Sequence, residues 1–312
     1  MTTSVTVRVP AKINLQLTVG PLRPDGYHDL VTVFHAVSLF DEVTVTPAEH
    51  DSVLVAGEGA TEVPADSDNL ALRAVRALRE ELAARGTAEP GAGGPVRVEI
   101  SKRIPVAAGM AGGSADAAAA LVGCDALWQT GLPAAALSDV AARLGSDVPF
   151  ALIGGTAVGR GRGEQLAALE AAPGSYHWVL GYADGHLSTP LVYKTLDQQR
   201  GDDPVPEPRL SEELMSALRG GDVRRLGDAL SNDLQAPAVS LFPALRDTLE
   251  AGRAAGALAA LVSGSGPTCF FLAADAAHAS DLAARLSAAG ACRTVAVASG
   301  PALGAHVLTP GV

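Results

Sequence analysis

From residue 5 to residue 19 apolar positions alternate with polar ones, which is the pattern of a strand with one buried face. Pro10 interrupts this run, and because proline cannot donate a ladder hydrogen bond we expect a bend or bulge there. A turn is expected over 24–28, followed by strand-like runs over 31–39 and 43–46. The N-terminal region is therefore predicted to be rich in β-structure.

A helical repeat replaces this alternation after residue 66. Apolar residues recur at helical spacing from Ala71 to Leu82, between a starting Asn69 and a terminating Gly86. Further along the chain the patterns predict a surface loop over 87–95, a strand over 96–100, a glycine-rich run, helices over 114–129 and 133–144 and a strand over 150–158.

Strand and helix signals continue to alternate in the C-terminal half, without an internal repeat. The patterns predict strands over 177–182, 259–263, 268–272 and 294–298, helices over 212–219, 222–230, 243–255 and 276–289, and an exposed loop over 198–208. This succession is typical of a two-layer α+β domain. Because a glycine- and arginine-rich stretch follows residue 158, we expect domains over 1–158 and 159–298 and a tail over 299–312.

Composition and charge narrow the class of protein. The 312 residues are enough for two domains, and 48% hydrophobic against 18% charged residues indicates a globular chain. Lys and Arg number 23 against 34 Asp and Glu, so the net charge is 23 − 34 = −11, which disfavours nucleic-acid partners. A phosphorylated ligand must therefore be held locally, by backbone amides, a few cations and a metal.

The cysteines and the N-terminal segment indicate a cytoplasmic protein. Cys124, Cys269 and Cys292 are odd in number and lack CxxC spacing, so neither a disulfide framework nor a zinc cluster is expected. The first residues carry no apolar leader, and no run approaches the roughly 18 apolar residues of a membrane span. We therefore expect no membrane partner.

Two glycine-rich runs are candidate ligand sites. IPVAAGMAGGSAD, over 104–116, lies between a predicted strand and a predicted helix, where backbone amides and the helix N-terminus could hold a di- or triphosphate. It is neither a Walker A loop nor a GxGxxG fingerprint. A tight turn with Ser114 as N-cap is an equally good interpretation. SGSGP, over 263–267, is weaker evidence because serine-rich hairpin turns look the same.

Polar residues in two short runs could act on a phosphate. PAKIN places Lys12 and Asn14 on one strand face, together with Gln16. GSDVPF, over 145–150, centres on Asp147. A solvated strand face and a carboxylate bonded to local amides are the ordinary alternatives. Near a polyphosphate, however, the aspartate could accept a proton from an attacking hydroxyl while the lysine orients it.

The order of these runs resembles the GHMP kinase superfamily. A PxxxGMxGGSxxAA loop after a strand, a PAKINL start and a late SGSGP run are similar to its three motifs. Within it, PAKINL, DGYH at 25–28, GSDVPF and LSNDL at 230–234 together resemble the diphosphocytidyl-methylerythritol kinases. The similarity runs from about residue 10 to residue 297.

The resemblance implies an α+β fold with an N-terminal domain like ribosomal protein S5 domain 2 and a C-terminal ferredoxin-like domain, with ATP and Mg²⁺ bound between them. It implies transfer of phosphate from ATP to the 2-hydroxyl of 4-diphosphocytidyl-2-C-methyl-D-erythritol, giving the 2-phosphate and ADP, in non-mevalonate isoprenoid biosynthesis. A monomer or weak homodimer is expected.

The resemblance also assigns roles to residues. Asp147 is the expected base and Lys12 its partner. Residues expected to bind ATP are Asn69, Pro105, Val106, Ala107, Ala108, Gly109, Met110, Ala111, Gly112, Gly113, Ser114 and Ala115. Residues expected to bind the acceptor are Asn14, Tyr27, His28, Thr189, Pro190, Tyr193, Gly264 and Ser265. No residue is assigned as a metal ligand.

Some positions depart from the family pattern. Ala107, Ala108 and Ala111 stand where many relatives have glycine, so positive φ at any of them would be strained. Tyr193 replaces a phenylalanine but can still stack. A homoserine or mevalonate type of GHMP kinase and a non-catalytic ligand-binding module on the same fold are the alternatives. Without the family match, Tyr27 would be interpreted as a packed aromatic residue and His28 as a surface histidine.

Overall fold

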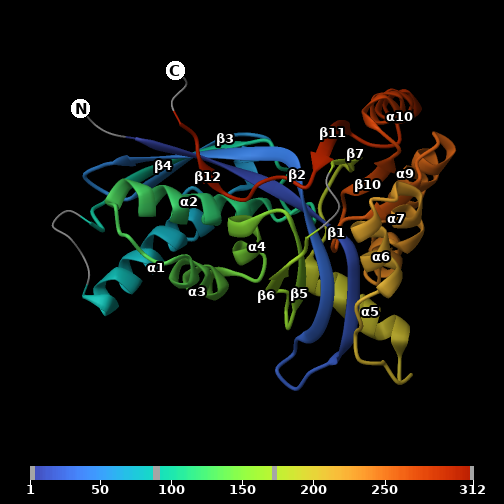
Figure 1. Ribbon diagram of the computed structural model, residues 1–312, viewed down its shortest axis with the longest axis horizontal. Helices are drawn as coiled ribbons and strands as arrows, with labels where there is room; N and C mark the ends of the chain where they lie inside the picture. Colours follow the sequence, from blue (N-terminus) through green and yellow to red (C-terminus); the bar gives the residue numbers. More distant parts are fainter. Residues whose placement is uncertain (1–3, 87–91, 171–173, 310–312) are drawn as a thin grey trace.

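The computed structural model describes residues 4–86, 92–170 and 174–309, which form two sheets with helices packed against them (Figure 1). The strands of the first sheet are β1 (Val5–Leu22), β2 (His28–Pro47), β3 (Ser52–Gly57), β4 (Val96–Lys102), β5 (Thr156–Arg160), β6 (Gln165–Ala168), β8 (Ser231–Asn232) and β12 (His306–Val307). The strands of the second sheet are β7 (Tyr176–Tyr182), β9 (Ala259–Val262), β10 (Cys269–Ala273) and β11 (Thr294–Gly300).

Helices cover both sheets. Those near the first sheet are η1 (Ala60–Glu62), α1 (Leu70–Arg85), α2 (Gly112–Trp128), α3 (Ala134–Leu144) and α4 (Val148–Ile153). Those of the second half are α5 (Thr189–Arg200), α6 (Glu212–Gly220), α7 (Val223–Ala229), α8 (Gln235–Leu241), α9 (Ala244–Ala254) and α10 (Ala276–Ala289). Figure 1 shows α1 to α4 on one side of β1 and β2, and α6, α7, α9 and α10 on the other. The predicted α+β class is confirmed.

The long antiparallel pair β1–β2 forms the centre of the first sheet, in the order β12-β1-β2-β4-β3. The irregularity predicted at Pro10 is confirmed, because the register shifts between Pro10 and Ala11 and again between Asn14 and Gln16. β2 is one strand, although the sequence pattern predicted separate runs over 31–39 and 43–46. Asp41 and Glu42 interrupt the apolar pattern, yet both pair with residues of β1 and so continue the strand.

Helix α2 packs closely against this sheet because its residues are small. A methyl group added at Gly123 would lie 2.8 Å from a Val45 methyl carbon, so the helix backbone approaches the strands closely. Five of its eleven buried residues are alanines, which lose no side-chain entropy on packing. The N-terminus of α2 is thereby held rigidly at the end of the glycine-rich run.

Three local predictions are corrected by the structure. Residues 150–158 are not one strand: α4 occupies the first part, since Pro149 suits its first turn and Gly154 ends it at φ 62°. Helix α5 was not predicted, although Thr189 and Pro190 begin it and Gly201 follows its last residue. Helix α8 also went unpredicted. The predicted loop over 87–95 lies largely outside the described residues.

Residue 158, where the domain boundary is expected, lies in β5 of the first sheet. β5 and β6 form a hairpin within that sheet, and the glycine- and arginine-rich stretch is simply its turn. The expected tail over 299–312 also returns to this sheet in its described part, through a Gly154–Leu303 bridge and the pairing of β12 with β1. The first sheet is therefore built from segments distant in sequence.

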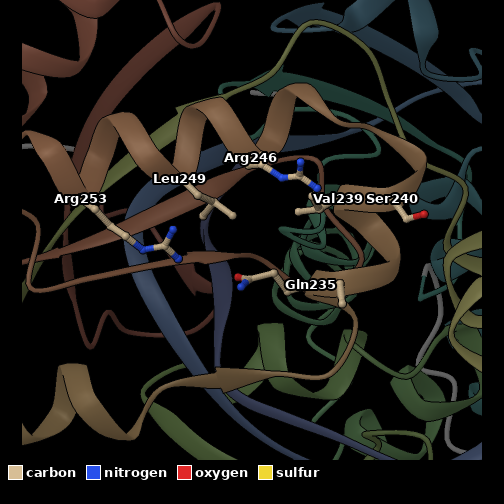
Figure 2. Close-up of a pocket in the computed structure, with 7 residues that line it drawn as sticks. Gln235, Val239, Ser240, Arg246, Leu249 and Arg253 are labelled. Atoms are coloured by element: carbon tan, nitrogen blue, oxygen red, sulfur yellow. The ribbon is translucent and has the colours of Figure 1, made fainter. Parts of the chain in front are cut away.

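Strand β9 lies at an edge of the second sheet, whose order is β11-β7-β10-β9, and one side chain each from α8 and α9 hydrogen-bonds to it. Figure 2 shows these two side chains, Gln235 and Arg253, in the pocket that they line. The Gln235 Oε1 accepts a hydrogen bond from the Val262 amide at 3.0 Å, and Arg253 donates to the Ala260 carbonyl at 3.4 Å. Satisfying these edge groups protects the strand from pairing with another chain.

Candidate active site

A cavity of about 920 Å³ lies where the first sheet meets the second half of the chain. Its walls come from the polar face of β1, the start of β2, the glycine-rich run, the start of α4 and the first turns of α5. Gly264 and Ser265 of the SGSGP run complete the lining. Segments that are far apart in sequence therefore converge on one site.

Lys12 lies at the floor of this cavity with 7% of its surface exposed. Its Nζ donates to Asn14 Oδ1 at 2.8 Å, and Asn14 Nδ2 donates to Thr32 Oγ1 at 2.8 Å. Burial lowers the pKa of the Lys12 ammonium, although the nearby carboxylate of Asp147 raises it in part. The interpretation of a solvated strand face is wrong, because Lys12 and Asn14 are buried at the site.

Asp147 faces Lys12 across the cavity, with a distance of 3.9 Å between Oδ2 and Nζ. The residue occupies the N-cap position of α4, yet within the described part of the chain its side chain caps no amide. About a third of the side chain remains exposed, at 32%. The alternative of a carboxylate bonded to local amides is therefore wrong, and the group is free to meet a ligand.

The glycine-rich run leads into α2 with unused backbone donors. The N-cap residue, Ala111, has no side-chain oxygen, and the first N–H groups of a helix lack intrahelical partners. Gly112, Gly113 and Ser114 line the cavity at this end. Ser114 is not the N-cap, because α2 already begins at Gly112. The tight-turn interpretation is thus corrected, and the geometry suits an anion.

Backbone strain is present in this run. Ala107 has φ 49° and Ala111 has φ 60°, in the left-handed region that alanine rarely occupies. Ala108, the third position where strain was considered, does not have positive φ. Two non-glycine residues of the loop are therefore held in unfavourable backbone conformations by their surroundings.

The SGSGP run packs directly on the glycine-rich run and on Lys12. Ser263 donates its hydroxyl to the Gly109 carbonyl at 3.0 Å, and a methyl group added at Gly109 would lie 2.0 Å from the Ser263 carbonyl oxygen. At Gly264 an added methyl group would lie 3.3 Å from Lys12 Nζ. Close approach therefore requires glycine at position 109, and the positive φ of 56° favours glycine at position 264.

A buried cluster of charges lies beneath the start of α2. Lys102 Nζ is 2.6 Å from Asp41 Oδ2 and 2.7 Å from Asp116 Oδ2. Burial raises the pKa of Asp116, and the two carboxylates hold the pKa of Lys102 above its usual value despite its burial. Asp116 lies in the second turn of α2, so the cluster ties this helix to β2 and β4.

The opposite end of the cavity carries aromatic rings. His28 stacks on Tyr193 with ring centroids 5.3 Å apart, and its Nε2 lies 2.9 Å from Asp197 Oδ1. Burial raises the pKa of the Tyr193 phenol. The Thr189 and Ser265 hydroxyls are hydrogen-bonded at 2.8 Å. The interpretation of His28 as a surface histidine is wrong, since only 6% of the residue is exposed.

Tyr27 stands at the mouth of this aromatic end. It is 53% exposed, and the Arg162 guanidinium lies 5.0 Å from its ring centroid. Tyr27 is thus not a packed core aromatic, because half of its surface is open to a ligand. The cation over one face leaves the other face available for stacking.

Most of the predicted site residues line the cavity. Those that do are Lys12, Asn14, Tyr27, His28, Ala107, Ala108, Gly109, Ala111, Gly112, Gly113, Ser114, Asp147, Thr189, Pro190, Tyr193, Gly264 and Ser265. Those that do not are Asn69, Pro105, Val106, Met110 and Ala115.

The predicted residues outside the lining have other positions. Asn69 is the N-cap of α1, accepting from the Ala71 amide at 2.9 Å, and it is 3% exposed. Met110 is fully buried, although its carbonyl accepts from the Lys12 amide at 3.3 Å. Pro105 and Val106 line a separate hollow of about 520 Å³ on the other side of the run. Their side chains therefore do not reach the main cavity.

Several cavity residues were missed by the sequence interpretation. Asp197, which pairs with His28, lies on the unpredicted helix α5. Arg162 belongs to the stretch that was interpreted as a domain junction. The Thr-Pro start and the closing glycine could have identified α5, whereas no local signal pairs residue 28 with residue 197.

Within the described ranges no group of three or more His, Cys, Asp and Glu side chains is arranged to hold a metal ion. Nor does any helix in that part of the chain have the length and apolarity needed to cross a bilayer.

Comparison with known proteins gives the family. Residues 69–155 match the GHMP kinases N terminal domain, and residues 214–292 match the profile described as GHMP kinases C terminal. The 4-diphosphocytidyl-2-C-methyl-D-erythritol kinase of Streptomyces avermitilis is 57% identical over 98% of this chain and 100% of its own length. The same enzyme of Thermobifida fusca is 57% identical over 98% of this chain and 99% of its own.

Solved structures agree with this assignment. A crystal structure of 4-(cytidine 5'-diphospho)-2C-methyl-D-erythritol kinase has a TM-score of 0.74 at 34% identity, over 94% of this chain and 98% of that one. Homoserine kinase from Cytophaga hutchinsonii has a TM-score of 0.71 at 17% identity, over 98% and 97%, and shows the shared fold alone. The chain therefore belongs to the GHMP kinases and, within them, to the 4-diphosphocytidyl-2-C-methyl-D-erythritol kinase family.

Proposed function

We propose that the protein transfers the γ-phosphate of ATP to the 2-hydroxyl of 4-diphosphocytidyl-2-C-methyl-D-erythritol, giving the 2-phosphate and ADP. The observation that carries this proposal is the position of the Lys12–Asp147 pair, 3.9 Å apart in the same cavity as both a phosphate-binding helix end and the stacked pair His28–Tyr193. The reaction belongs to non-mevalonate isoprenoid precursor biosynthesis.

Asp147 is proposed to act on the acceptor hydroxyl. Its carboxylate caps no amide within the described residues, so it can accept the hydroxyl proton as the oxygen attacks the γ-phosphorus. Lys12 holds this carboxylate in place, and Asn14 orients the lysine through a 2.8 Å hydrogen bond. The ammonium also offsets the negative charge that gathers on the transferring group.

ATP is proposed to place its phosphates at the start of α2. The free amides at 112–114 and the helix dipole favour an anion there, which a protein of net charge −11 cannot attract by its overall field. Mg²⁺ would neutralise phosphate charge. The chemistry of the groups present suits it, because the Ser114 hydroxyl and the Asp147 carboxylate are hard oxygen ligands that line the same cavity as these amides.

The aromatic end is proposed to hold the cytidine group. Tyr193 and Tyr27 offer faces for stacking on a base, and His28 is held edge-on to Asp197 by a 2.9 Å contact. The His28–Asp197 pair can present a ring nitrogen to a polar base edge. Small acceptors such as homoserine or mevalonate have no group to fill this end.

Turnover on three acceptors tests the proposal. A coupled ADP-release assay with Mg²⁺ and ATP compares 4-diphosphocytidyl-2-C-methyl-D-erythritol, homoserine and mevalonate. We expect turnover on the first alone. Turnover on homoserine or mevalonate instead would support kinase chemistry but overturn the proposed acceptor. If the folded protein binds ATP but phosphorylates none of the three acceptors, both the kinase activity and the proposed acceptor are overturned.

A further inference from the structure

The LSNDL run at 230–234 contains two polar residues that do not line the cavity. Asn232 and Asp233 lie at the end of β8, a short strand that runs parallel to β1 and pairs Leu17 with Asn232. The Asp233 amide continues this pairing by donating to the Leu17 carbonyl at 2.9 Å. Both residues therefore lie beside the strand that carries Lys12, next to Leu17.

Asn232 fixes the SGSGP run through its side-chain amide. Nδ2 donates to the carbonyls of Val262 and Gly264, each at 2.8 Å. Its Oδ1 accepts from the Leu234 amide at 2.9 Å, so the amide group is held in one orientation. Gly264 is the residue where an added methyl group would meet Lys12 Nζ at 3.3 Å. Asn232 thus determines where this backbone lies relative to the lysine.

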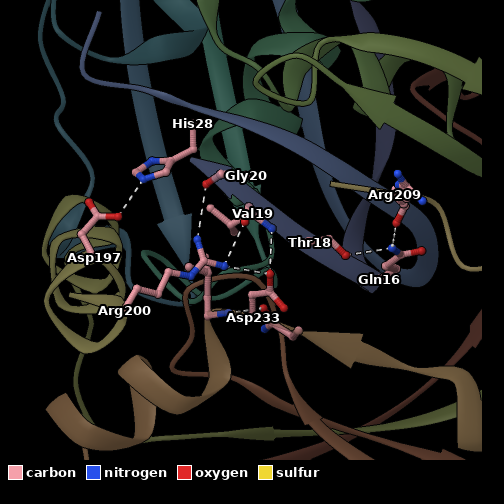
Figure 3. A network of polar contacts seen from close by, with 11 residues as sticks. Gln16, Thr18, Val19, Gly20, His28, Asp197, Arg200, Arg209 and Asp233 are labelled. Atoms are coloured by element: carbon pink, nitrogen blue, oxygen red, sulfur yellow. Dashed lines mark hydrogen bonds and ion pairs between the residues drawn. The ribbon is translucent and has the colours of Figure 1, made fainter. Parts of the chain in front are cut away.

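Asp233 fixes helix α5 through a different set of contacts (Figure 3). Its Oδ2 accepts from the Val19 amide at 2.9 Å and from Arg200 Nη2 at 3.2 Å. Arg200, the last residue of α5, also donates to the Val19 carbonyl at 2.9 Å. The same helix carries Tyr193 and Asp197. Asp233 therefore determines where the aromatic wall lies relative to β1.

We propose that Asn232 and Asp233 are positioning residues with separate tasks in this kinase. Asn232 holds the Gly264 backbone against Lys12 and so affects phosphoryl transfer. Asp233 holds α5 against β1 and so affects binding of the acceptor's aromatic end. The proposal rests on the proposed function only for the choice of acceptor, because both contacts concern the geometry of the cavity itself.

A pair of near-isosteric variants tests this division. Asn232→Asp keeps an acceptor for the Leu234 amide but turns the donor into an oxygen that repels both carbonyls. We expect kcat to fall about 10- to 100-fold with acceptor KM nearly unchanged, because a small displacement at the reacting centre affects rate more than binding. Asp233→Asn keeps the Val19 contact but loses the charge paired with Arg200. We expect acceptor KM to rise about 3- to 10-fold with kcat nearly unchanged.

Asp228→Asn is the matched control, since Asp228 is an exposed carboxylate on α7 nearby in sequence. It should leave kcat and KM at wild-type values. Amide hydrogen exchange gives a readout that needs no acceptor: it should become faster at 263–268 in Asn232→Asp and over 189–200 in Asp233→Asn. If Asn232→Asp does not fold, Asn232→Ser, which keeps one donor, should show the same effect more weakly.

The outcomes separate this proposal from the proposed function. Wild-type turnover on another acceptor would refute the proposed substrate, and the kcat and KM comparison would then be made with that acceptor. The separate positioning roles would be overturned if both variants showed the same fall in kcat and the same rise in acceptor KM. They would also be overturned if amide hydrogen exchange at 263–268 and 189–200 stayed unchanged.

Discussion

At the scale of single residues, Asp147 and Lys12 are expected to control turnover. Asp147→Asn should lower kcat by about 100- to 10,000-fold, because the amide cannot accept the hydroxyl proton. Lys12→Ala should also lose turnover, since it frees the carboxylate and leaves phosphate charge unbalanced. Steady-state kinetics with a separate ATP-binding titration measures both effects.

The control for these variants is Asp139→Asn, which changes an exposed carboxylate on α3. It should behave as wild type, and ATP binding should persist in all three proteins. Near-normal kcat in Asp147→Asn would remove the assigned role of the base, and normal kcat in Lys12→Ala would remove that of its partner.

Tyr193 is expected to act through its ring and not through its hydroxyl. Tyr193→Phe should keep acceptor KM within about 2-fold, whereas Tyr193→Ala should raise it about 10-fold or more, since stacking on a base contributes roughly 1–3 kcal/mol. Acceptor titrations at saturating ATP measure the difference. A large KM increase in Tyr193→Phe would instead assign the recognition to the phenol.

The sequence identified individual site residues where a local motif carries them. Lys12, Asp147 and the glycine-rich run could be found because each lies in a short recognisable pattern. Thr32 and Asp197 could not, since each acts through a residue on another element: Thr32 holds Asn14 and Asp197 holds His28. The structure also shows that Asn69 serves as a helix cap, a role that the Asp-Asn-Leu pattern equally allowed.

At the scale of elements, the buried cluster that ties α2 to β2 and β4 should be sensitive to which charge is removed. Lys102→Met should lower the free energy of unfolding by about 3–5 kcal/mol, because it leaves two buried carboxylates without their cation. Asp116→Asn should lower the free energy of unfolding much less, since Lys102 keeps its contact with Asp41. Urea unfolding at pH 7 measures both.

The pH dependence of the Asp116 variant gives an independent check. Burial raises the pKa of this carboxyl above its unfolded value of 3.8, so wild-type stability should decline as the pH rises through its folded pKa. Asp116→Asn should lack this decline. Parallel pH profiles for the two proteins would contradict the assignment.

Elements were predictable where periodicity ran long and unbroken. α1 and α10 agree with their predicted ranges, because in each helix the capping residues lie at the two ends of the apolar stripe. α4 was mistaken for strand because the apolar run at 148–153 is too short to distinguish the two by period. The stretch that forms the hairpin turn between β5 and β6 was interpreted as a domain junction, because glycine and arginine are common in both.

At the scale of the whole molecule, His35 lies at the contact between the two sheets. It is fully buried on β2, its ring packs edge-on to Trp178 of β7 at 5.6 Å, and Nδ1 lies 2.8 Å from Thr156 Oγ1. Burial lowers the pKa of His35 from 6.5 to about 3. The neutral ring is therefore part of the folded state.

Protonation of His35 should weaken the folded state in acid. The contribution of the neutral ring to the free energy of unfolding is complete above pH 6.5 and falls as the pH drops towards 3, by on the order of 5 kcal/mol across that window. His35→Gln should flatten this part of the profile of unfolding free energy against pH, whereas His50→Gln, at an exposed site, should not. Equal slopes in wild type and His35→Gln would refute the prediction.

The return of the chain to its first strand has a consequence for the order of folding. Val7 on β1 pairs with Val43 on one side and with Val307 on the other, and β8 joins the same strand from the middle of the second half. A ribosome delivers β1 early and β12 last, so the edge of β1 stays open while most of the chain is being made. The sheet that carries Lys12 therefore gains its β12 edge only after the second half of the chain has been made.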